Sequence, residues 1–320
     1  MIATFGEALV DLIEQPDGRF APCLGGSVCN FTVALARQGV PTRYLNPLSR
    51  DHFGERFDAL LRGAGVDLPG HPRSAGPTSL AVVSLDAYGS PSYAFHREGV
   101  ADRDIDARAA IAAFPAPLEL LHTGGLTLVP ADLDKTLEIC AAAAARGALV
   151  SVDANMRPML ASDLGAYGAG VRRALDQAHV AKVSDEDLDA LGIGRGSLDA
   201  IVGALFPGSA LELVVYTQGP RGAALLTRRH QVELAAPAGL RVVDTVGAGD
   251  CFHAGLVACL LRAGALASRE QLAALEPAQL RAALRHAIAA ASVNIMRSGC
   301  DPATWQETLD EVSRHASAGQ

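Results

Sequence analysis

A turn of small residues around Gly247 and Gly249 is followed at once by a carboxylate, Asp250. The segment from Ala248 to about Leu261 repeats apolar side chains at a spacing of four, which predicts a helix. Glycines leave backbone N–H groups accessible, and the first N–H groups of a helix lack internal partners and carry partial positive charge. Such a turn can bind an anion. Taken alone, Asp250 is more simply explained as a carboxylate that stabilises a helix start.

The whole string from Asp244 to Asp250, DTVGAGD, resembles the signature of the ribokinase-like (PfkB) family of sugar kinases. The resemblance implies ATP with Mg²⁺ as the donor complex and Asp250 as the base that takes the proton of a sugar hydroxyl. It also implies an anion hole made by the amides of Gly247, Ala248 and Gly249. Positioning and charge stabilisation carry most of the catalysis of phosphoryl transfer. No GxxxxGK[ST] string occurs, which excludes the P-loop design.

A second glycine turn, Gly25-Gly26, opens another helical pattern that begins at about Asn30. From the residues alone, Asn30 is a helix cap. Asp11 ends an apolar run and is, on the same basis, either a turn carboxylate or a side chain that points into a cleft. In the family that the chain resembles, residues matching Asp11, Gly25, Gly26 and Asn30 bind the sugar.

Two arginines lie within sequence segments that resemble family motifs. The segment around Arg97, FHREGVADR, resembles the one that carries a substrate-facing arginine in fructokinases and 2-keto-3-deoxygluconate kinases. Without that resemblance, Arg97 is a solvated charge on an edge strand. Arg157 belongs to DANMRP, which resembles the family's D-x-N-x-R-P string, and it follows a predicted strand. Open α/β sheets bind ligands at the carboxyl ends of their strands, so we expect Arg157 on the substrate side.

The resemblance also implies nucleotide and ion contacts. The turn TQGPRG resembles a family turn that contacts ATP phosphates, and the helix start SDED replaces the usual N-x-x-E. An acidic helix start explains SDED equally well. The implied nucleotide contacts are Ser184, Thr217, Gly219, Gly222 and Gly249. Asp187 would reach Mg²⁺ indirectly, whereas Asp244 and Gly299 would border a K⁺ site, although a helix C-cap also explains Gly299.

The predicted elements have to bring these motifs together. From Leu120 onward strands and helices alternate, as in a mainly parallel sheet covered by helices on both faces. Residues 2–5 and 8–12 predict one broken first strand, and Val242 and Val243 predict the end of the strand before the catalytic turn. We expect an α/β fold: a three-layer α/β/α sandwich formed by one domain over residues 1–320. A small β-sheet lid would come from segments at about 12–25 and 72–100, with a turn at 86–89 and a homodimer contact.

Composition limits the function classes. The chain has 27 basic and 35 acidic residues and a net charge of −8, so we expect neither nucleic acid nor membrane surfaces as partners. The six cysteines make no CxxC pair, which is typical of reduced thiols in a cytoplasmic protein. Next to Asp250, Cys251 is predicted to pack under the turn rather than to act as an acidic thiol. No apolar run approaches the length of a membrane span.

The resulting hypothesis is a sugar kinase that transfers the γ-phosphate of ATP to D-fructose, giving D-fructose 6-phosphate. A kinase of 2-keto-3-deoxygluconate is the alternative within the same class, and an inactive sugar-binding regulator is the alternative in another class. The intact Asp250 argues against the regulator. A dinucleotide-dependent oxidoreductase is disfavoured because no GxGxxG follows the first strand.

Overall fold

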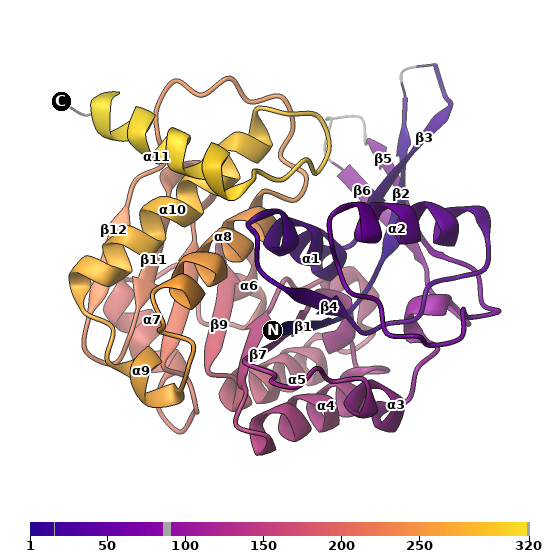
Figure 1. The fold of residues 1–320 in the computed structure, drawn as a ribbon, viewed down its shortest axis with the longest axis horizontal. Coiled ribbons are helices and arrows are strands. Elements are labelled where there is room, and N and C mark those ends of the chain that lie inside the picture. Colours follow the sequence, from indigo (N-terminus) through magenta and orange to yellow (C-terminus); the bar gives the residue numbers. More distant parts are fainter. Residues whose placement is uncertain (16, 86–90, 319–320) are drawn as a thin grey trace.

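The computed structural model describes residues 1–15, 17–85 and 91–318. Its larger sheet has eight strands in the order β12-β11-β10-β9-β8-β7-β1-β4, and only β11 runs against the others, pairing antiparallel with β10 and β12 (Figure 1). Helices cover both faces. The strands of this sheet are β1 (Ile2–Phe5), β4 (Thr42–Tyr44), β7 (Leu120–Gly124), β8 (Leu149–Asp153), β9 (Val180–Ser184), β10 (Leu213–Thr217), β11 (Ala223–Leu226) and β12 (Gln231–Leu234).

The two helical layers bury alternate residues of the same strands. Along β10, Leu213 and Val215 join one core cluster, whereas Val214 and Tyr216 join the other. Strands buried on both faces are apolar at nearly every position, as expected for a parallel sheet between helices. One layer holds α1 (Ser27–Arg37), α8 (Ala248–Arg262), α9 (Arg269–Ala273), α10 (Pro277–Ile295) and α11 (Trp305–Ala318). The other holds α3 (Ala107–Ala112), α4 (Leu133–Ala145), α5 (Leu164–Gln177), α6 (Asp185–Ala190) and α7 (Leu198–Leu205).

A separate four-stranded sheet, the lid sheet, projects from the edge of the molecule beside α2 (His52–Gly63) (Figure 1). One face of this sheet packs on α2, because Val10 joins a core cluster with Phe57 and Leu61. Since side chains alternate along a strand, Asp11 faces the opposite way. The strands run in the order β3-β2-β5-β6 and comprise β2 (Leu9–Glu14), β3 (Phe20–Gly25), β5 (Ser79–Leu85) and β6 (Pro91–His96).

The three-layer sandwich with its lid sheet confirms the predicted fold class. The antiparallel pairing of β5 with β6 agrees with the expected hairpin, but its turn at 86–89 lies outside the described residues. The single broken strand predicted at residues 2–12 is wrong. β1 pairs within the larger sheet and β2 within the lid sheet, so the break at Gly6–Ala8 is a crossing from one sheet to the other.

The strand end predicted at Val242 and Val243 is also wrong. These side chains are 57% and 51% exposed, and no strand of the described chain lies between Leu234 and α8. The backbone is held instead by the end of α10, since the amides of Val243 and Asp244 both donate to the Ile295 carbonyl, at 2.8 and 3.2 Å. Val242 and Val243 are therefore part of an extended loop and not of a β-strand.

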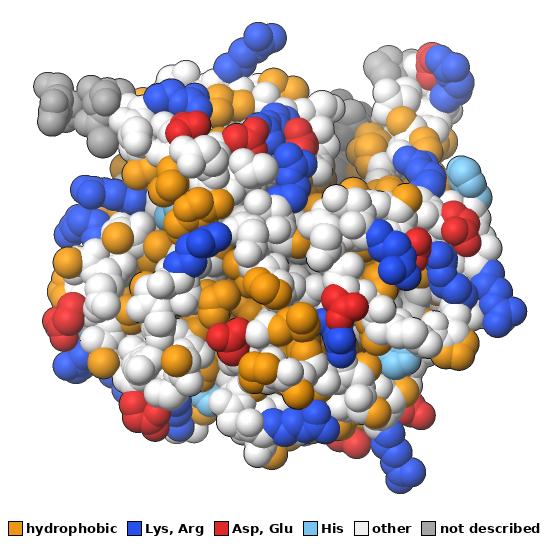
Figure 2. Space-filling model, in the orientation of Figure 1, with side chains coloured by type: hydrophobic (Ala, Val, Ile, Leu, Met, Phe, Trp, Pro, Cys, Tyr) orange, Lys and Arg blue, Asp and Glu red, His pale blue; other side chains and the backbone are white. Residues whose placement is uncertain are grey.

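The charged side chains of the surface are mixed rather than gathered by sign. Acidic and basic side chains are interspersed over the face seen in Figure 2. Within residues 1–15, 17–85 and 91–318, no helix combines the length and apolar character that crossing a membrane requires.

Candidate active site

The catalytic turn predicted from sequence forms the start of α8. Gly247 is its N-cap with φ 72°, and a Cβ there would lie 2.4 Å from Cys300 Sγ, so glycine is needed for both conformation and space. The Ala248 amide donates to the Thr245 carbonyl at 3.2 Å. The Ala248 amide of the predicted anion hole is therefore engaged, whereas the amides of Gly247, Gly249 and Asp250 have no acceptor among the residues that the structure describes and are left for an anion.

Asp250 lies in the first turn of α8, where the first turn of α1 holds it. Ser27 Oγ donates to Asp250 Oδ1 at 2.7 Å, and Asn30 Nδ2 donates to Asp250 Oδ2 at 3.0 Å. Burial raises the pKa of Asp250 above its ordinary value, and these two hydrogen bonds oppose the rise. The result is a fixed carboxylate with increased proton affinity, which suits a general base.

A cavity of about 350 Å³ separates the lid sheet from Asp250. We call it the acceptor cavity. Its polar lining includes most of the predicted substrate residues, while Leu9, Ile13, Val83, Tyr93 and Phe95 form an apolar wall from the lid sheet. Of the residues named from sequence, the cavity brings together Asp11, Gly26, Asn30, Arg157, Gly247, Ala248, Gly249 and Asp250.

Gly25 does not line the acceptor cavity but makes room for Asp11. A Cβ on Gly25 would lie 2.8 Å from Asp11 Oδ2. Burial raises the pKa of Asp11 to about 6, although the charge of Arg157 opposes the rise. Arg157 Nη1 donates to Asn155 Oδ1 at 2.7 Å, and Asn155 itself adopts φ 32° and lines the cavity. This places a cation and an amide opposite the lid-sheet carboxylate.

Arg97 lies outside the acceptor cavity. It is 8% exposed, and its guanidinium pairs with Asp102 at 3.0 Å and donates to the Leu126 carbonyl at 3.2 Å. The structure therefore places this arginine behind the cavity wall. Arg157 is the one arginine among the residues that line the cavity within the described chain.

Lys182 is a further residue of the site, although a lysine within an apolar strand has no distinctive sequence signal. It is buried in the middle of β9, and its Nζ donates to Asp153 Oδ2 at 2.8 Å. A Cβ on Gly249 would lie 3.4 Å from this nitrogen, so the ammonium reaches the anion-binding turn. Desolvation lowers the pKa of Lys182, but the charges of Asp153, Asp187 and Asp250 outweigh it and raise the pKa above its ordinary value. The side chain is a permanent cation beside the place where phosphate charge would develop.

Three further residues of the site could not be identified from the sequence, because nothing in their sequence neighbourhood indicates a functional role. Ser27 directly follows the double glycine, where a serine is common in turns and indicates no particular role. Asn155 belongs to the DANMRP string, but the resemblance assigns a substrate contact only to its arginine. Glu7 lines the acceptor cavity, although its position between two apolar runs indicated only a break in a strand.

A second cavity, of about 630 Å³, lies on the other side of the turn. We call it the donor cavity. It includes all the predicted nucleotide contacts: Ser184, Thr217, Gly219, Gly222 and Gly249. Its remaining lining is largely apolar, from Ala236, Pro237, Leu240, Val242, Phe252, Ile288, Ala291 and Ile295, which suits a flat aromatic base. The two cavities share Thr245, Ala248 and Gly249, so they meet at the start of α8.

The predicted ion-binding residues are occupied by protein donors. Asp187 Oδ1 accepts from the Met156 amide at 2.7 Å, and its Oδ2 accepts from the amide and hydroxyl of Ser184, at 2.8 Å each. Glu186 also lines the donor cavity, and its carboxylate has no protein partner in the part of the chain that the structure describes. No group of three or more His, Cys, Asp or Glu side chains with metal-binding geometry occurs among the described residues. So few free carboxylate oxygens fit a metal ion that binds together with the phosphates of its ligand, rather than one that the protein holds alone.

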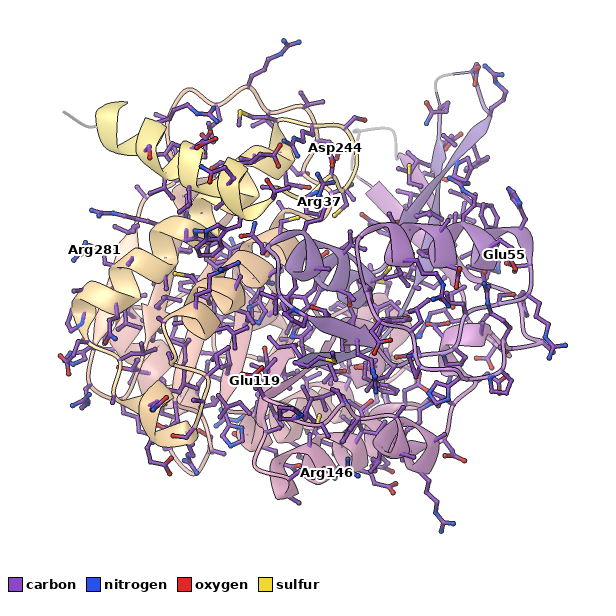
Figure 3. All side chains as sticks on the ribbon, in the orientation of Figure 1. Arg37, Glu55, Glu119, Arg146, Asp244 and Arg281 are labelled. Atoms are coloured by element: carbon purple, nitrogen blue, oxygen red, sulfur yellow. The ribbon has the colours of Figure 1, made fainter. Side chains whose placement is uncertain are left out.

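Asp244 and Gly299 lie together, as the K⁺ hypothesis requires. The Gly299 amide donates to Asp244 Oδ2 at 2.8 Å, and the Val246 amide donates to Oδ1 at 3.0 Å. In the view of Figure 3, Asp244 lies where the C-terminal helices approach the lid sheet. Nearby, Cys251 Sγ is 4.0 Å from Cys300 Sγ, and this contact together with burial raises the pKa of Cys251 well above its ordinary value. Cys251 therefore packs under the turn, as predicted, and is not an acidic thiol.

Known proteins share both the sequence pattern and the fold. The profile of the pfkB family carbohydrate kinases matches residues 1–307. A fructokinase of Rhizobium leguminosarum bv. trifolii is 34% identical over 285 residues, which cover 88% of this chain and 86% of the relative. The structure of fructokinase from Xylella fastidiosa with bound ATP has a TM-score of 0.86 at 28% identity and covers 98% of both chains. A double-mutant fructokinase from Vibrio cholerae O395, in a form with fructose, ADP and potassium ion bound, has a TM-score of 0.76 at 27% identity and covers 93% of both chains.

Proposed function

This chain belongs to the pfkB family of carbohydrate kinases, as its signature indicated, and we propose that the sugar it phosphorylates is D-fructose, giving D-fructose 6-phosphate. The observation that carries the proposal is the position of Asp250, which lines the acceptor cavity directly beside the turn shared with the donor cavity. A sugar hydroxyl in one cavity can therefore meet a terminal phosphate from the other.

The proposed reaction assigns one task to each group at this junction. Asp250, held by Ser27 and Asn30, accepts the proton of the attacking hydroxyl. The Gly249 amide and the Lys182 ammonium hold the charge that develops on the transferred phosphoryl group. Mg²⁺ bound to ATP would supply further neutralisation of the phosphates, and Glu186, which lines the donor cavity, would hold its water ligands.

The acceptor cavity favours a neutral ketohexose over a sugar acid. Arg97 is committed to Asp102, which leaves Arg157 to pair with any substrate carboxylate. Phe95, two residues before Arg97, contributes packing but no hydroxyl group. The hydroxyl groups of fructose would be bound by Asp11, Asn30 and Asn155. The three relatives named above are fructokinases from bacteria, which supports the same choice.

2-Keto-3-deoxygluconate stays as the second acceptor because Arg157 lines the cavity and an arginine can bind a carboxylate through two hydrogen bonds. The deciding experiment measures ADP release with MgATP and equal concentrations of fructose, 2-keto-3-deoxygluconate, ribose and adenosine. We expect the highest kcat/KM with fructose. A higher value with the keto-acid would reverse the ranking, and ADP release with none of the four would call for a wider sugar screen. Absence of phosphorylation across that screen would favour an inactive binding regulator.

We further propose that the lid sheet contributes a homodimer contact. Tyr93 of β6 is 39% exposed although it lines the acceptor cavity, and Phe20 of β3 is 44% exposed. Apolar side chains at the rim of a sheet are stabilised when a second copy covers them. Light scattering should give twice the chain mass at micromolar concentration, and Phe20→Ser should weaken the association. A monomer at all concentrations would contradict this assembly.

A further inference from the structure

Glu7 occupies the short link, Gly6–Ala8, by which the chain passes from β1 of the larger sheet to β2 of the lid sheet. It is 2% exposed to solvent and lines the acceptor cavity. None of the roles assigned above uses it. A buried carboxylate at the wall of a sugar cavity needs a physical account, because an unpaired carboxylate oxygen in such a place is costly.

The Glu7 carboxyl is fixed in place by its surroundings. Oε1 accepts a hydrogen bond from the Ser27 amide at 3.0 Å, at the start of α1. Cβ atoms on two neighbouring glycines would crowd it: one on Gly26 would lie 3.2 Å from Glu7 Cγ, and one on Gly125 would lie 3.2 Å from Glu7 Oε1. Both glycines have positive φ, 99° and 56° respectively, so the backbone there is shaped to approach this side chain.

The second carboxyl oxygen, Oε2, is buried and has no hydrogen-bond partner among the described residues. The Arg97 guanidinium hydrogen-bonds to Asp102 and to the Leu126 carbonyl, and it acts on Glu7 through its charge, as Arg157 also does. Burial raises the pKa of Glu7 to about 7, and Arg97 opposes the rise. A donor that reaches Oε2 would therefore stabilise the carboxylate, and the acceptor cavity is the space from which a donor can come.

We propose that Glu7 determines acceptor specificity: Oε2 accepts a hydrogen bond from a hydroxyl of a neutral sugar, and the carboxylate repels acceptors that carry a carboxylate of their own. The inference rests on the proposed function and adds to it a residue that selects for sugar alcohol groups. Glu7 and Asp11 give this wall two acidic groups, and of the two cations that line the cavity, Arg157 and Lys182, the second lies at the anion-binding turn. A site built to bind a hydroxyl group discriminates strongly when the hydrogen bond cannot form.

Two variants separate the two parts of the proposal. Glu7→Gln keeps the size and an oxygen for the Ser27 amide but places an NH₂ group where Oε2 stood and removes the charge. Glu7→Asp keeps the charge but withdraws the carboxylate by one methylene group. Glu14→Gln is the matched control, because Glu14 is an exposed residue of the same strand, β2.

With fructose and MgATP, we expect Glu7→Gln to lower kcat/KM by about tenfold or more, mainly through KM for the sugar. KM for ATP should not change. The ratio of kcat/KM for fructose to that for 2-keto-3-deoxygluconate should also fall about tenfold, because the repulsion of the sugar acid is lost. Glu7→Asp should lose affinity for fructose yet keep the low activity on the acid, and Glu14→Gln should match the wild type.

Binding of fructose without ATP, measured by calorimetry, should show the same loss in Glu7→Gln, and circular dichroism should show unchanged folding. Wild-type KM and wild-type selectivity in a folded Glu7→Gln protein would overturn the inference while leaving the fructokinase proposal standing. If the wild type instead phosphorylates a neutral sugar other than fructose, the proposed substrate is wrong, and the variants are compared on that sugar. A wild type that prefers the keto-acid would contradict both.

Discussion

At the scale of single residues, the catalytic carboxylate is defined by what touches it. Asp250 accepts hydrogen bonds from Ser27 and Asn30 on a different helix, and Lys182 stands on its phosphate side. Asp250 and Asn30 could be predicted because they belong to recognisable strings. Ser27 and Lys182 could not, since neither a serine after two glycines nor a lysine in an apolar strand has a distinctive neighbourhood until distant segments are brought together.

Replacement of the base tests the proton transfer. Asp250→Asn keeps the shape and can still bond to Ser27, but it cannot take a proton, so turnover should fall by roughly 10²-fold or more. Steady-state kinetics checks the rate, and circular dichroism checks the fold. Asp134→Asn is the matched control, because Asp134 is also in the first turn of a helix, α4, but is exposed. Near-normal turnover of Asp250→Asn would refute the assignment.

Removal of the serine hydroxyl tests how the base is tuned. The hydrogen bond from Ser27 lowers the pKa of Asp250, so Ser27→Ala should raise that pKa further. Because the base must be ionised, the acidic limb of the kcat/KM profile should move to higher pH. Ser162→Ala, at an exposed serine outside both cavities, serves as the control. An unshifted acidic limb would show that Ser27 does not tune the base.

At the scale of elements, the first turn of α1 is built against the Glu7 link. Gly26 has φ 99°, and a Cβ there would lie 2.6 Å from the Glu7 carbonyl oxygen. The sequence predicted a glycine turn at this place, but not what the glycines approach. The alternation of strands and helices from Leu120 onward was predictable from apolar periodicity, whereas the path of residues 235–247 was not, because its contacts are with the end of α10.

A methyl group at Gly26 should therefore be costly. We expect Gly26→Ala to lower the free energy of unfolding by about 1 to 3 kcal/mol and to raise KM for the acceptor, because α1 and Glu7 must move apart. Gly147→Ala is the matched control: Gly147 has φ 82° but open space around it. Urea denaturation and sugar kinetics measure both effects. Equal losses of stability in the two variants would show that the backbone angle, and not the close approach, sets the cost.

A buried polar network joins the sheet to the catalytic helix. Ser151 Oγ bonds to His122 Nδ1 at 3.1 Å and to His253 Nε2 at 2.8 Å, which links β7, β8 and α8. Burial lowers the pKa of His122 to about 3 and that of His253 well below its ordinary value. Both imidazoles are therefore neutral in the folded protein, while in the unfolded chain they take up protons near pH 6.5.

This network predicts loss of stability in acid. As the pH falls below about 6.5 toward 3, the unfolded chain binds more protons than the folded one, so each imidazole lowers the free energy of unfolding by about 1.4 kcal/mol per pH unit. The raised pKa values of Glu7 and Asp11 act in the opposite sense, so a comparison of variants is needed. Urea midpoints between pH 7.5 and 5 should fall less in His122→Gln than in the wild type. The control His52→Gln, at an exposed histidine, should behave as the wild type; equal slopes in all three would contradict the account.

At the scale of the whole molecule, two sheets enclose the acceptor while the ends of α8 and α10 close the catalytic turn. The layered fold could be predicted, because alternating strand and helix patterns allow few arrangements. The passage from one sheet to the other at Glu7 could not, since both runs are equally apolar. The identity of the acceptor sugar could not be predicted from the sequence either. The segment around Arg97 resembles one that carries a substrate-facing arginine, yet the partners of Arg97 hold it behind the cavity wall.

The loops that meet at Asp244 and Gly299 predict an effect of monovalent cations. If K⁺ binds there, it lies beside the anion-binding turn and stabilises its conformation and its charge. Activity with MgATP should then rise when K⁺ replaces a large organic cation at constant ionic strength. The same titration should have no effect on folding at low temperature, followed by circular dichroism. Equal rates in both salts would reject the K⁺ site and leave the kinase assignment intact.

The hydrogen bond between Ser27 and Asp250 joins residues 223 positions apart in the chain. A ribosome adds about 5 to 20 residues per second, so roughly 10 to 45 s pass between the synthesis of the serine and that of its partner. During that interval the nascent chain already contains Glu7, Asp11 and Asn30, yet it has no base. Enzymatic activity can thus begin only after α8 has emerged and docked on α1. The time at which activity first appears during translation therefore reports when the two halves of the molecule join.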